Sequence, residues 1–253
     1  MLDRPWLQRA FDVARAAAEA GGSIALGHYR AGVAVERKGD GSPVTIADRE
    51  AEAAIVAVIR DAFPDHGILG EEGGELATGS ARWIIDPIDG THGFANGGLF
   101  WGPLVALEAG GEIVAGALAL PVLGELYVAA KGLGCWRDRE RVTLSTTSRW
   151  EDATVSFGQL RRIATRIGWD RLQRIIDTAG SARSYGDVGA AVMLLSGRAE
   201  VWLEAGVAPW DIAPQQILVT EAGGRFVDLS TEKSALLAAN APLFEHVRAL
   251  CGA

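Results

Sequence analysis

The stretch Trp83-Ile84-Ile85-Asp86-Pro87-Ile88-Asp89-Gly90-Thr91 carries the strongest structural signal in the chain. An apolar strand is predicted to end in Asp86, because the proline that follows disfavours helical backbone at the residue before it. Asp89 comes close enough behind it to face the same pocket. Gly90 can adopt backbone angles closed to other residues, and Thr91 is expected to begin a short helix whose free amides can hold a phosphate. Acidic side chains and anion-binding amides are therefore predicted to lie side by side.

Acids beside an anion-binding turn make chemical sense when cations bridge them, and an all-oxygen ligand set favours hard ions such as Mg²⁺. Two more acidic segments could complete such a site. Leu69-Gly70-Glu71-Glu72-Gly73 follows a short predicted strand, and Pro209-Trp210-Asp211 opens a predicted helix. Each also has an ordinary interpretation: the glutamate pair as a solvated turn, and Asp211 as a helix-start residue interacting with the helix dipole.

Hydrophobic periodicity and turn residues divide the rest of the chain into helices and strands. Helices are predicted over 5–30, 45–63, 169–177, 187–196, 209–222 and 242–250. Strands are predicted over 68–69, 83–86, 100–107, 113–120, 126–129, 154–157, 182–185, 199–203 and 225–227. This order predicts an α/β protein of layered sheets with helices between them. We place a boundary near residue 145, so that 1–145 and 146–253 form two subdomains packed as one unit.

Composition excludes several classes of protein. The chain has 253 residues, 49% of them apolar, which is enough for a large core. A net charge of −8 argues against nucleic acid as a partner. Cys135 and Cys251 fit no zinc pattern, and neither a Gly-x-Ser-x-Gly nucleophile turn nor a Walker A loop is present. No apolar run is long enough for a membrane span and residues 1–10 do not resemble a signal peptide, so we expect a cytoplasmic protein.

Taken in order, the acidic segments resemble the signature set of the inositol monophosphatase family. The matching stretches are Gly70-Glu71-Glu72, Asp86-Pro87-Ile88-Asp89-Gly90-Thr91, Trp210-Asp211-Ile212-Ala213 and Glu221-Ala222-Gly223-Gly224. The resemblance runs nearly from end to end. It implies an αβαβα sandwich with an antiparallel N-terminal sheet and a smaller C-terminal α/β sheet. It also implies a homodimeric Mg²⁺-dependent phosphatase acting on a small phosphorylated metabolite.

Carried over residue by residue, the resemblance assigns roles within the site. The implied ligands of roughly two or three Mg²⁺ ions are Glu71, Asp86, the Ile88 carbonyl, Asp89 and Asp211. The implied catalytic groups are Thr91, Asp48 and Glu71, with Asp48 orienting the Thr91 hydroxyl toward the attacking water. The implied substrate contacts are Lys38, Asp89, Gly90, Thr91, Asp187 and Glu204. The first subdomain would thus supply most metal ligands, and the second Asp211 and substrate contacts. Asp48 could instead belong to a capping box with Thr45, and Lys38 could be a solvated charge.

Within the family, three stretches resemble the histidinol-phosphatase branch: Trp101 to Leu107, Ala153 to Phe157, and Arg183 to Asp187. Glu204 could pair with the ammonium of L-histidinol phosphate, or accept hydrogen bonds from sugar hydroxyls. His92-Gly93-Phe94 departs from the family pattern. The alternatives are therefore a phosphatase for inositol 1-phosphate, a sugar phosphate or a specialised-metabolite phosphate and, outside catalysis, an inactive binding relative.

Overall fold

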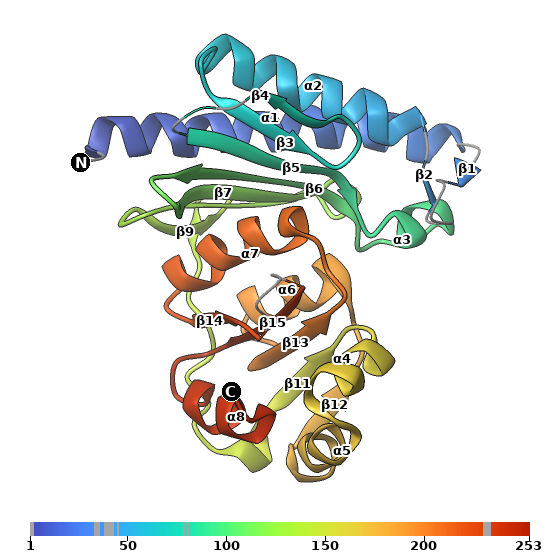
Figure 1. Cartoon of the computed structure of the whole chain (residues 1–253), viewed down its shortest axis with the longest axis vertical. Coiled ribbons are helices and arrows are strands. Elements are labelled where there is room, and N and C mark those ends of the chain that lie inside the picture. Colours follow the sequence, from blue (N-terminus) through green and yellow to red (C-terminus); the bar gives the residue numbers. More distant parts are fainter. Residues whose placement is uncertain are drawn as a thin grey trace.

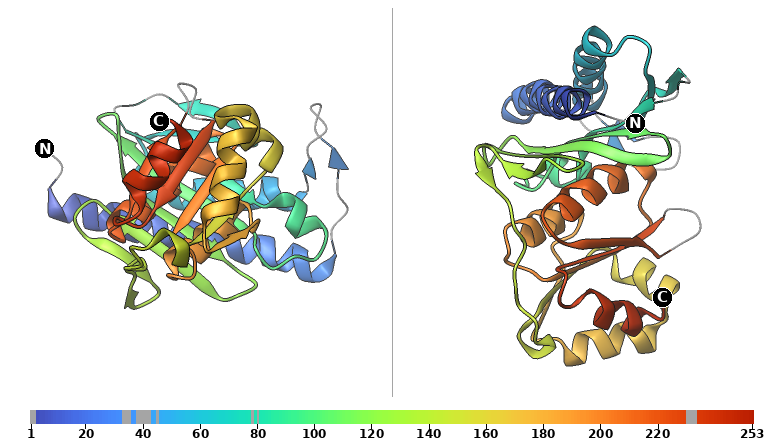
Figure 2. Two further views of the ribbon diagram at one scale, coloured as in Figure 1. Left: turned by 90° about the horizontal axis from the view of Figure 1, so that it is seen from below. Right: turned by 90° about the vertical axis from the view of Figure 1, so that its left-hand side faces the viewer.

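Five layers of helices and sheets stack along the long axis of the molecule (Figure 1). The computed structural model describes residues 3–32, 36–37, 43–44, 46–77, 79, 81–229 and 234–253. Helices α1 (Arg4–Ala31) and α2 (Ile46–Ala62) form the first layer, over one face of a large sheet. Figure 2 shows the same succession from two further sides. The layering expected from the sequence is confirmed.

The large sheet has eight strands in the order β10-β9-β8-β7-β6-β5-β3-β4. Their bounds are β3 (Gly67–Gly70), β4 (Gly74–Ala77), β5 (Ala81–Asp89), β6 (Gly102–Ala109), β7 (Glu112–Leu120), β8 (Glu125–Ala130), β9 (Gly134–Arg137) and β10 (Glu140–Arg141). Neighbouring strands are antiparallel, as expected, except that β3 and β5 are parallel. The exception arises because the chain reverses twice through β4, which lies on the outer edge, before β5 pairs with β3 on its other side.

The second sheet is smaller and mixed, with five strands in the order β12-β11-β13-β15-β14. These strands are β11 (Thr154–Phe157), β12 (Ser181–Arg183), β13 (Val201–Ala205), β14 (Arg225–Asp228) and β15 (Ala235–Ala239). Helices α6 (Asp187–Leu195) and α7 (Pro209–Glu221) lie between the two sheets. The far face is covered by α4 (Leu160–Ile167), α5 (Trp169–Thr178) and α8 (Phe244–Cys251).

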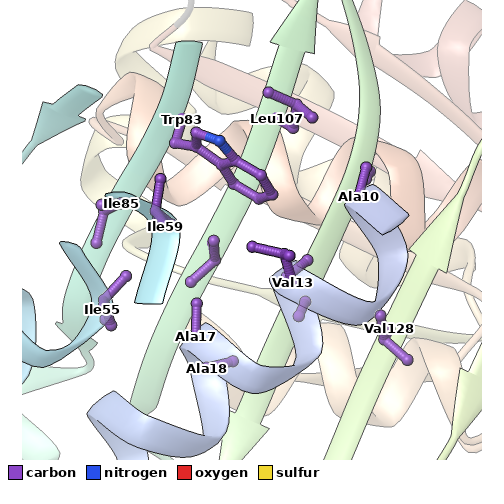
Figure 3. Packing of buried hydrophobic residues seen from close by; sticks show 14 of the residues in the cluster. Ala10, Val13, Ala17, Ala18, Ile55, Ile59, Trp83, Ile85, Leu107 and Val128 are labelled. Atoms are coloured by element: carbon purple, nitrogen blue, oxygen red, sulfur yellow. The ribbon is translucent and has the colours of Figure 1, made fainter. Parts of the chain in front are cut away.

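Local sequence explains where α1 begins and ends. The side chain of Asp3 accepts the backbone N–H of Trp6 at 2.9 Å, which caps the first turn. Gly32, at φ +74°, ends the helix in a conformation that side chains disfavour. Small residues from Ala10 to Ala18 let α1 approach the sheet closely, and Trp83 packs beneath them (Figure 3).

Most predicted elements are present with shifted ends, but some short ones were not predicted. The sequence did not predict β4, the hairpin of β9 and β10, α4, or β15 inside the second sheet. It also ended the β5 strand at residue 86, whereas pairing continues to Asp89. Three further short elements are β1 (Glu36–Arg37), β2 (Pro43–Val44) and α3 (Thr91–Ala95). The large sheet ends at Arg141 and the small one begins at Thr154, and the boundary at residue 145 stays a prediction.

Candidate active site

Three aspartates from two distant parts of the chain converge between the layers. Asp86 and Asp89 come from β5, and Asp211 comes from the first turn of α7. One carboxylate oxygen from each lies within 4.8 Å of the others. Asp86 is buried, and the other two are partly buried. This spacing suits carboxylates that share a cation.

A β-bulge directs the first two acids to the same side of the large sheet. Residues three apart on a regular strand face opposite sides, because side chains alternate with a period of two. Here Asp86 pairs with Leu104 and Asp89 pairs with Gly102, so β5 contains one residue more than β6 between these pairs. The Ile88 N–H donates to Asp86 Oδ1 at 2.9 Å inside the bulge. The sequence had suggested that both acids face one pocket, and the extra residue is what makes this possible.

Asp211 is held in place by its own helix start. Its Oδ2 accepts the N–H of Ala208 at 2.7 Å, so the carboxylate folds back over the first turn of α7. That turn has N–H groups without helical partners, and the positive end of the helix dipole favours an ionised carboxylate. The ordinary role of a helix-start acid and a place in the acidic cluster are therefore combined in one residue.

Glu71 lies in the turn after β3, close enough to Asp86 to raise the pKa of that carboxyl. The turn is fixed from behind by Glu52 of α2, which is 6% exposed. Glu52 Oε2 accepts the N–H of Glu72 at 2.9 Å, and Glu52 Oε1 accepts that of Gly73 at 2.8 Å. Sequence reasoning did not single out Glu52. A signal was available, since Glu52 lies four residues after Asp48 on the face of α2 that is otherwise apolar.

Without a counter-charge, the acidic cluster resists full ionisation. Burial, followed by repulsion from Glu71, Asp89 and Asp211, raises the pKa of Asp86 well above its usual value. Burial also raises the pKa of Asp211 to about 6, partly offset by the bond from Ala208. Hard divalent cations prefer oxygen ligands, and the carboxylates of this cluster supply several such oxygens together with negative charge. The residues present therefore fit Mg²⁺.

The turn after the bulge has the predicted backbone. Gly90 has φ +80°, and α3 follows at Thr91. The Thr91 hydroxyl donates to the Ile88 carbonyl at 2.9 Å, which connects two of the residues in the expected site. Asp48 is 1% exposed and has a polar or electrostatic partner of its own. Its expected role in orienting Thr91 stays a prediction. Lys38 and Thr45 lie outside the described residues.

Glu204 on β13 approaches the cluster from the second sheet. It is 3% exposed, and its Oε1 accepts the N–H of Gln159 at 3.0 Å. Its Oε2 forms no hydrogen bond of good geometry among the described residues, although the indole of Trp202, two residues earlier on β13, lies near enough to act on the carboxyl. Burial raises the pKa of Glu204 to about 7. A Cβ at Gly158 would overlap its carboxylate, so only glycine leaves room for this side chain.

Asp187 completes the acidic surroundings at the start of α6. It has a positive φ of 44°, which is uncommon for a residue other than glycine. Its charge acts on both Asp89 and Glu204, and His92 is its electrostatic counterpart. Because the charges of Asp187, Asp211 and Glu204 all act on Asp89, these acids lie near one another.

Comparisons with known proteins agree with this architecture. A family model described as "Inositol monophosphatase family" matches residues 6–250. The chain is 37% identical over 232 residues to a protein named histidinol-phosphatase from Chlorobaculum parvum, covering 91% of this chain and 88% of that one. It is 32% identical over 245 residues to a Dictyostelium discoideum inositol monophosphatase, covering 90% and 86%.

Solved structures extend the likeness to three dimensions. The extragenic suppressor protein suhB from Bartonella henselae superposes with a TM-score of 0.86 at 28% identity, covering 96% of this chain and 98% of that one. The family match spans nearly the whole chain, and the acidic cluster of this fold lies where its signature segments meet. The chain belongs to the inositol monophosphatase family and is a hydrolase of phosphate monoesters.

Proposed function

We propose that this protein is a Mg²⁺-dependent phosphatase whose substrate is L-histidinol phosphate. The observation that carries the substrate assignment is the buried Glu204 carboxylate, which has one oxygen anchored by backbone and the other without a well-formed hydrogen bond in the described chain. A buried carboxylate with an unpaired oxygen is stabilised by a ligand cation or hydrogen-bond donor. The ammonium of histidinol phosphate supplies both.

The metal-binding role falls to four side chains. Glu71, Asp86, Asp89 and Asp211 would hold Mg²⁺, together with the carbonyl of Ile88. Bound Mg²⁺ supplies Lewis-acid chemistry, polarising the phosphate and lowering the pKa of a water molecule. The proximity of the three aspartate oxygens and the raised pKa of Asp86 support this assignment. The number of ions, roughly two or three, is part of the proposal.

The remaining residues bind and orient the substrate. Gly90 and the first turn of α3 would hold the phosphate through backbone N–H groups, since the first amides of a helix lack internal partners. Thr91 would position the attacking water, assisted by Asp48 and Glu71. Asp187 and Glu204 would bind the cationic end of the leaving group, while Lys38 would contact the phosphate end.

Sugar hydroxyls are the competing occupants of the same contact. An ionised Glu204 accepts hydrogen bonds from them equally well by geometry, and one family relative named above is an inositol monophosphatase. The two substrates differ in charge: an ammonium is attracted by Asp187 and Glu204 together, whereas a neutral ring gains no such attraction. Cytoplasmic location and homodimer formation stay predictions. Within the described residues, no helix combines the length and apolar character needed to cross a membrane.

A substrate panel with and without Mg²⁺ tests the proposal. Turnover should require Mg²⁺ and should be greatest with L-histidinol phosphate among inositol 1-phosphate, fructose 1,6-bisphosphate and adenosine 3′,5′-bisphosphate. Glu204→Gln should raise KM for histidinol phosphate by about tenfold, or ~1.4 kcal/mol, and change KM for inositol 1-phosphate much less.

Glu200→Gln provides a matched control. Glu200 is also buried and accepts a backbone N–H, from Thr154 at 2.7 Å, and it lies outside the acidic cluster. Absence of turnover on histidinol phosphate, with activity on another member of the panel, would reject the substrate assignment. Full turnover without divalent cations would reject the metal-dependent mechanism.

A further inference from the structure

A second cavity lies beside α7, between the two sheets. Its volume is about 480 Å³, within the range of small-molecule sites, and none of the acids of the metal cluster lines it. Apolar side chains form its walls, among them Leu69, Ile84, Ile212 and Phe226. Arg82, Glu108, Gln216 and Asp228 supply polar groups. The cavity therefore combines an apolar interior with a small set of charges.

One of the charged groups that line this cavity is a guanidinium with N–H donors left for a ligand. Arg82 and Glu108 are partners across β5 and β6, and Arg82 Nε lies 2.6 Å from Glu108 Oε2. A guanidinium has five N–H donors, and among the described residues only the Nε of Arg82 forms a hydrogen bond. Its terminal NH₂ groups can bind a carboxylate. Asp228, which also has an interaction of its own, adds a second negative charge to the lining.

We infer that this cavity binds a small zwitterion with an apolar body, of the class of α-amino acids with large apolar side chains. The ligand carboxylate would contact Arg82, its ammonium would face Glu108 and Asp228, and its side chain would pack against Leu69, Ile84 and Phe226. Two acids beside one base disfavour a simple anion, whereas opposite charges on one ligand satisfy both kinds of group. The inference is independent of the phosphatase substrate proposed above.

Occupancy of the cavity is linked to metal binding. Three residues that line the cavity are close in sequence to proposed metal ligands. Leu69 lies two residues before Glu71, Ile84 lies two residues before Asp86, and Ile212 directly follows Asp211. Of these pairs only Ile84 and Asp86 lie on one strand, β5, where residues two apart share a face and are ~7 Å apart. A ligand that orders these walls changes the affinity for Mg²⁺, and Mg²⁺ changes the affinity for the ligand by the same factor.

Calorimetric titration of the full chain with L-phenylalanine, without Mg²⁺, is the direct test. L-Phenylalanine should bind saturably, and 3-phenylpropionate and 2-phenylethylamine, which each lack one charge, should bind at least about tenfold more weakly. Arg82→Gln should weaken L-phenylalanine binding by about tenfold or more. Ile113→Trp, which fills the cavity from β7, should abolish it.

Arg137→Gln is the matched control, because Arg137 forms an exposed pair with Glu140 at the same 2.6 Å and lies outside this cavity. Absence of saturable binding, unchanged binding in both cavity variants, or equal binding of a singly charged probe would overturn the inference.

A change in the oligomeric state of Arg82→Gln, measured by light scattering, would also overturn it, since a second copy of the chain would then occupy the cavity. A Mg²⁺ affinity that shifts by less than about threefold with L-phenylalanine would overturn the linkage. None of these measurements depends on turnover.

Discussion

The Oε2 atom of Glu52 accepts the backbone N–H of Glu72 at 2.9 Å, and this bond connects α2 to the turn that carries Glu71. The other carboxylate oxygen of Glu52 accepts the N–H of Gly73. Gly70 leaves room for the carboxylate, because a Cβ there would overlap it. Partners behind a metal ligand fix its direction, and their loss commonly lowers metal affinity or activity tenfold to about a hundredfold.

Glu52→Gln should therefore weaken Mg²⁺ binding by about tenfold. The amide replaces one acceptor with an NH₂ group, which cannot accept either backbone N–H. The Mg²⁺ concentration giving half-maximal turnover measures the effect. Glu50→Gln, at an exposed position of the same helix, is the control. An unchanged Mg²⁺ requirement in Glu52→Gln would show that the turn keeps its shape without the carboxylate.

Asp89→Asn should lower turnover by at least about a hundredfold, because it removes a proposed metal ligand at the centre of the site. Steady-state kinetics at saturating Mg²⁺ and substrate measure this loss. Asp61→Asn changes an exposed acid on α2 and should leave turnover unaltered. Near-normal turnover of Asp89→Asn would place the metal centre elsewhere.

Removing Mg²⁺ should reveal a pH-dependent loss of stability. The folded-state pKa of Asp211 is raised to about 6 from 3.8, so the folded protein holds a proton that the unfolded chain has released in this interval. The metal-free protein should therefore lose stability as pH rises from about 4 to 6. With Mg²⁺ present at pH 8, the melting temperature should recover by a few °C or more, since ligands of the folded state stabilise it.

The Asp211→Asn variant tests whether charge repulsion among the acids, rather than misfolding, lowers the stability of the metal-free protein. The neutral side chain relieves repulsion, so this variant without Mg²⁺ at pH 8 should melt above the metal-free wild type, and Mg²⁺ should raise its melting temperature less. Thermal unfolding followed by circular dichroism measures both effects. A variant that melts lower without Mg²⁺ yet responds fully to the ion would contradict the assigned role of Asp211.

Gly158→Ala should alter substrate binding more than metal binding. The new methyl group would overlap the Glu204 carboxylate and displace it from its present position. We expect KM for the preferred substrate to rise by about tenfold while the Mg²⁺ requirement stays constant. Gly27→Ala is the control, because a Cβ there meets no atom within 4 Å. Parallel rises in KM and in the Mg²⁺ requirement would mean that the two sites are not separable.

The sequence predicted long elements with a strong hydrophobic periodicity well, and it predicted short elements poorly. The apolar repeat from Leu7 to Ala18 predicted α1 nearly to its ends, whereas β9 and β10 are short segments with polar residues that match no periodic pattern. The acidic residues were identified from their order, but their convergence depends on contacts between β5 and α7. No local rule contains that information.

Two features of the site could be found only in three dimensions. The cap formed by Glu52 joins residues twenty apart, and the shape of the Glu204 site depends on Gly158, which lies on a neighbouring segment. Their individual residue types are common. What distinguishes them is that a carboxylate is buried against backbone N–H groups, and the sequence reveals this only as an acid within an apolar pattern.

The extra residue in β5 makes the number of residues between Asp86 and Asp89 as important as their chemical identity. Inserting one residue between Gly102 and Leu104 of β6 would restore regular pairing and turn Asp89 toward the face where Trp83 and Ile85 pack under α1 and α2. A charged side chain would then enter the apolar core, and the cation would lose a ligand. Selection should therefore remove insertions and deletions from these paired strands during evolution, even where neighbouring side chains are substituted and the preferred substrate changes.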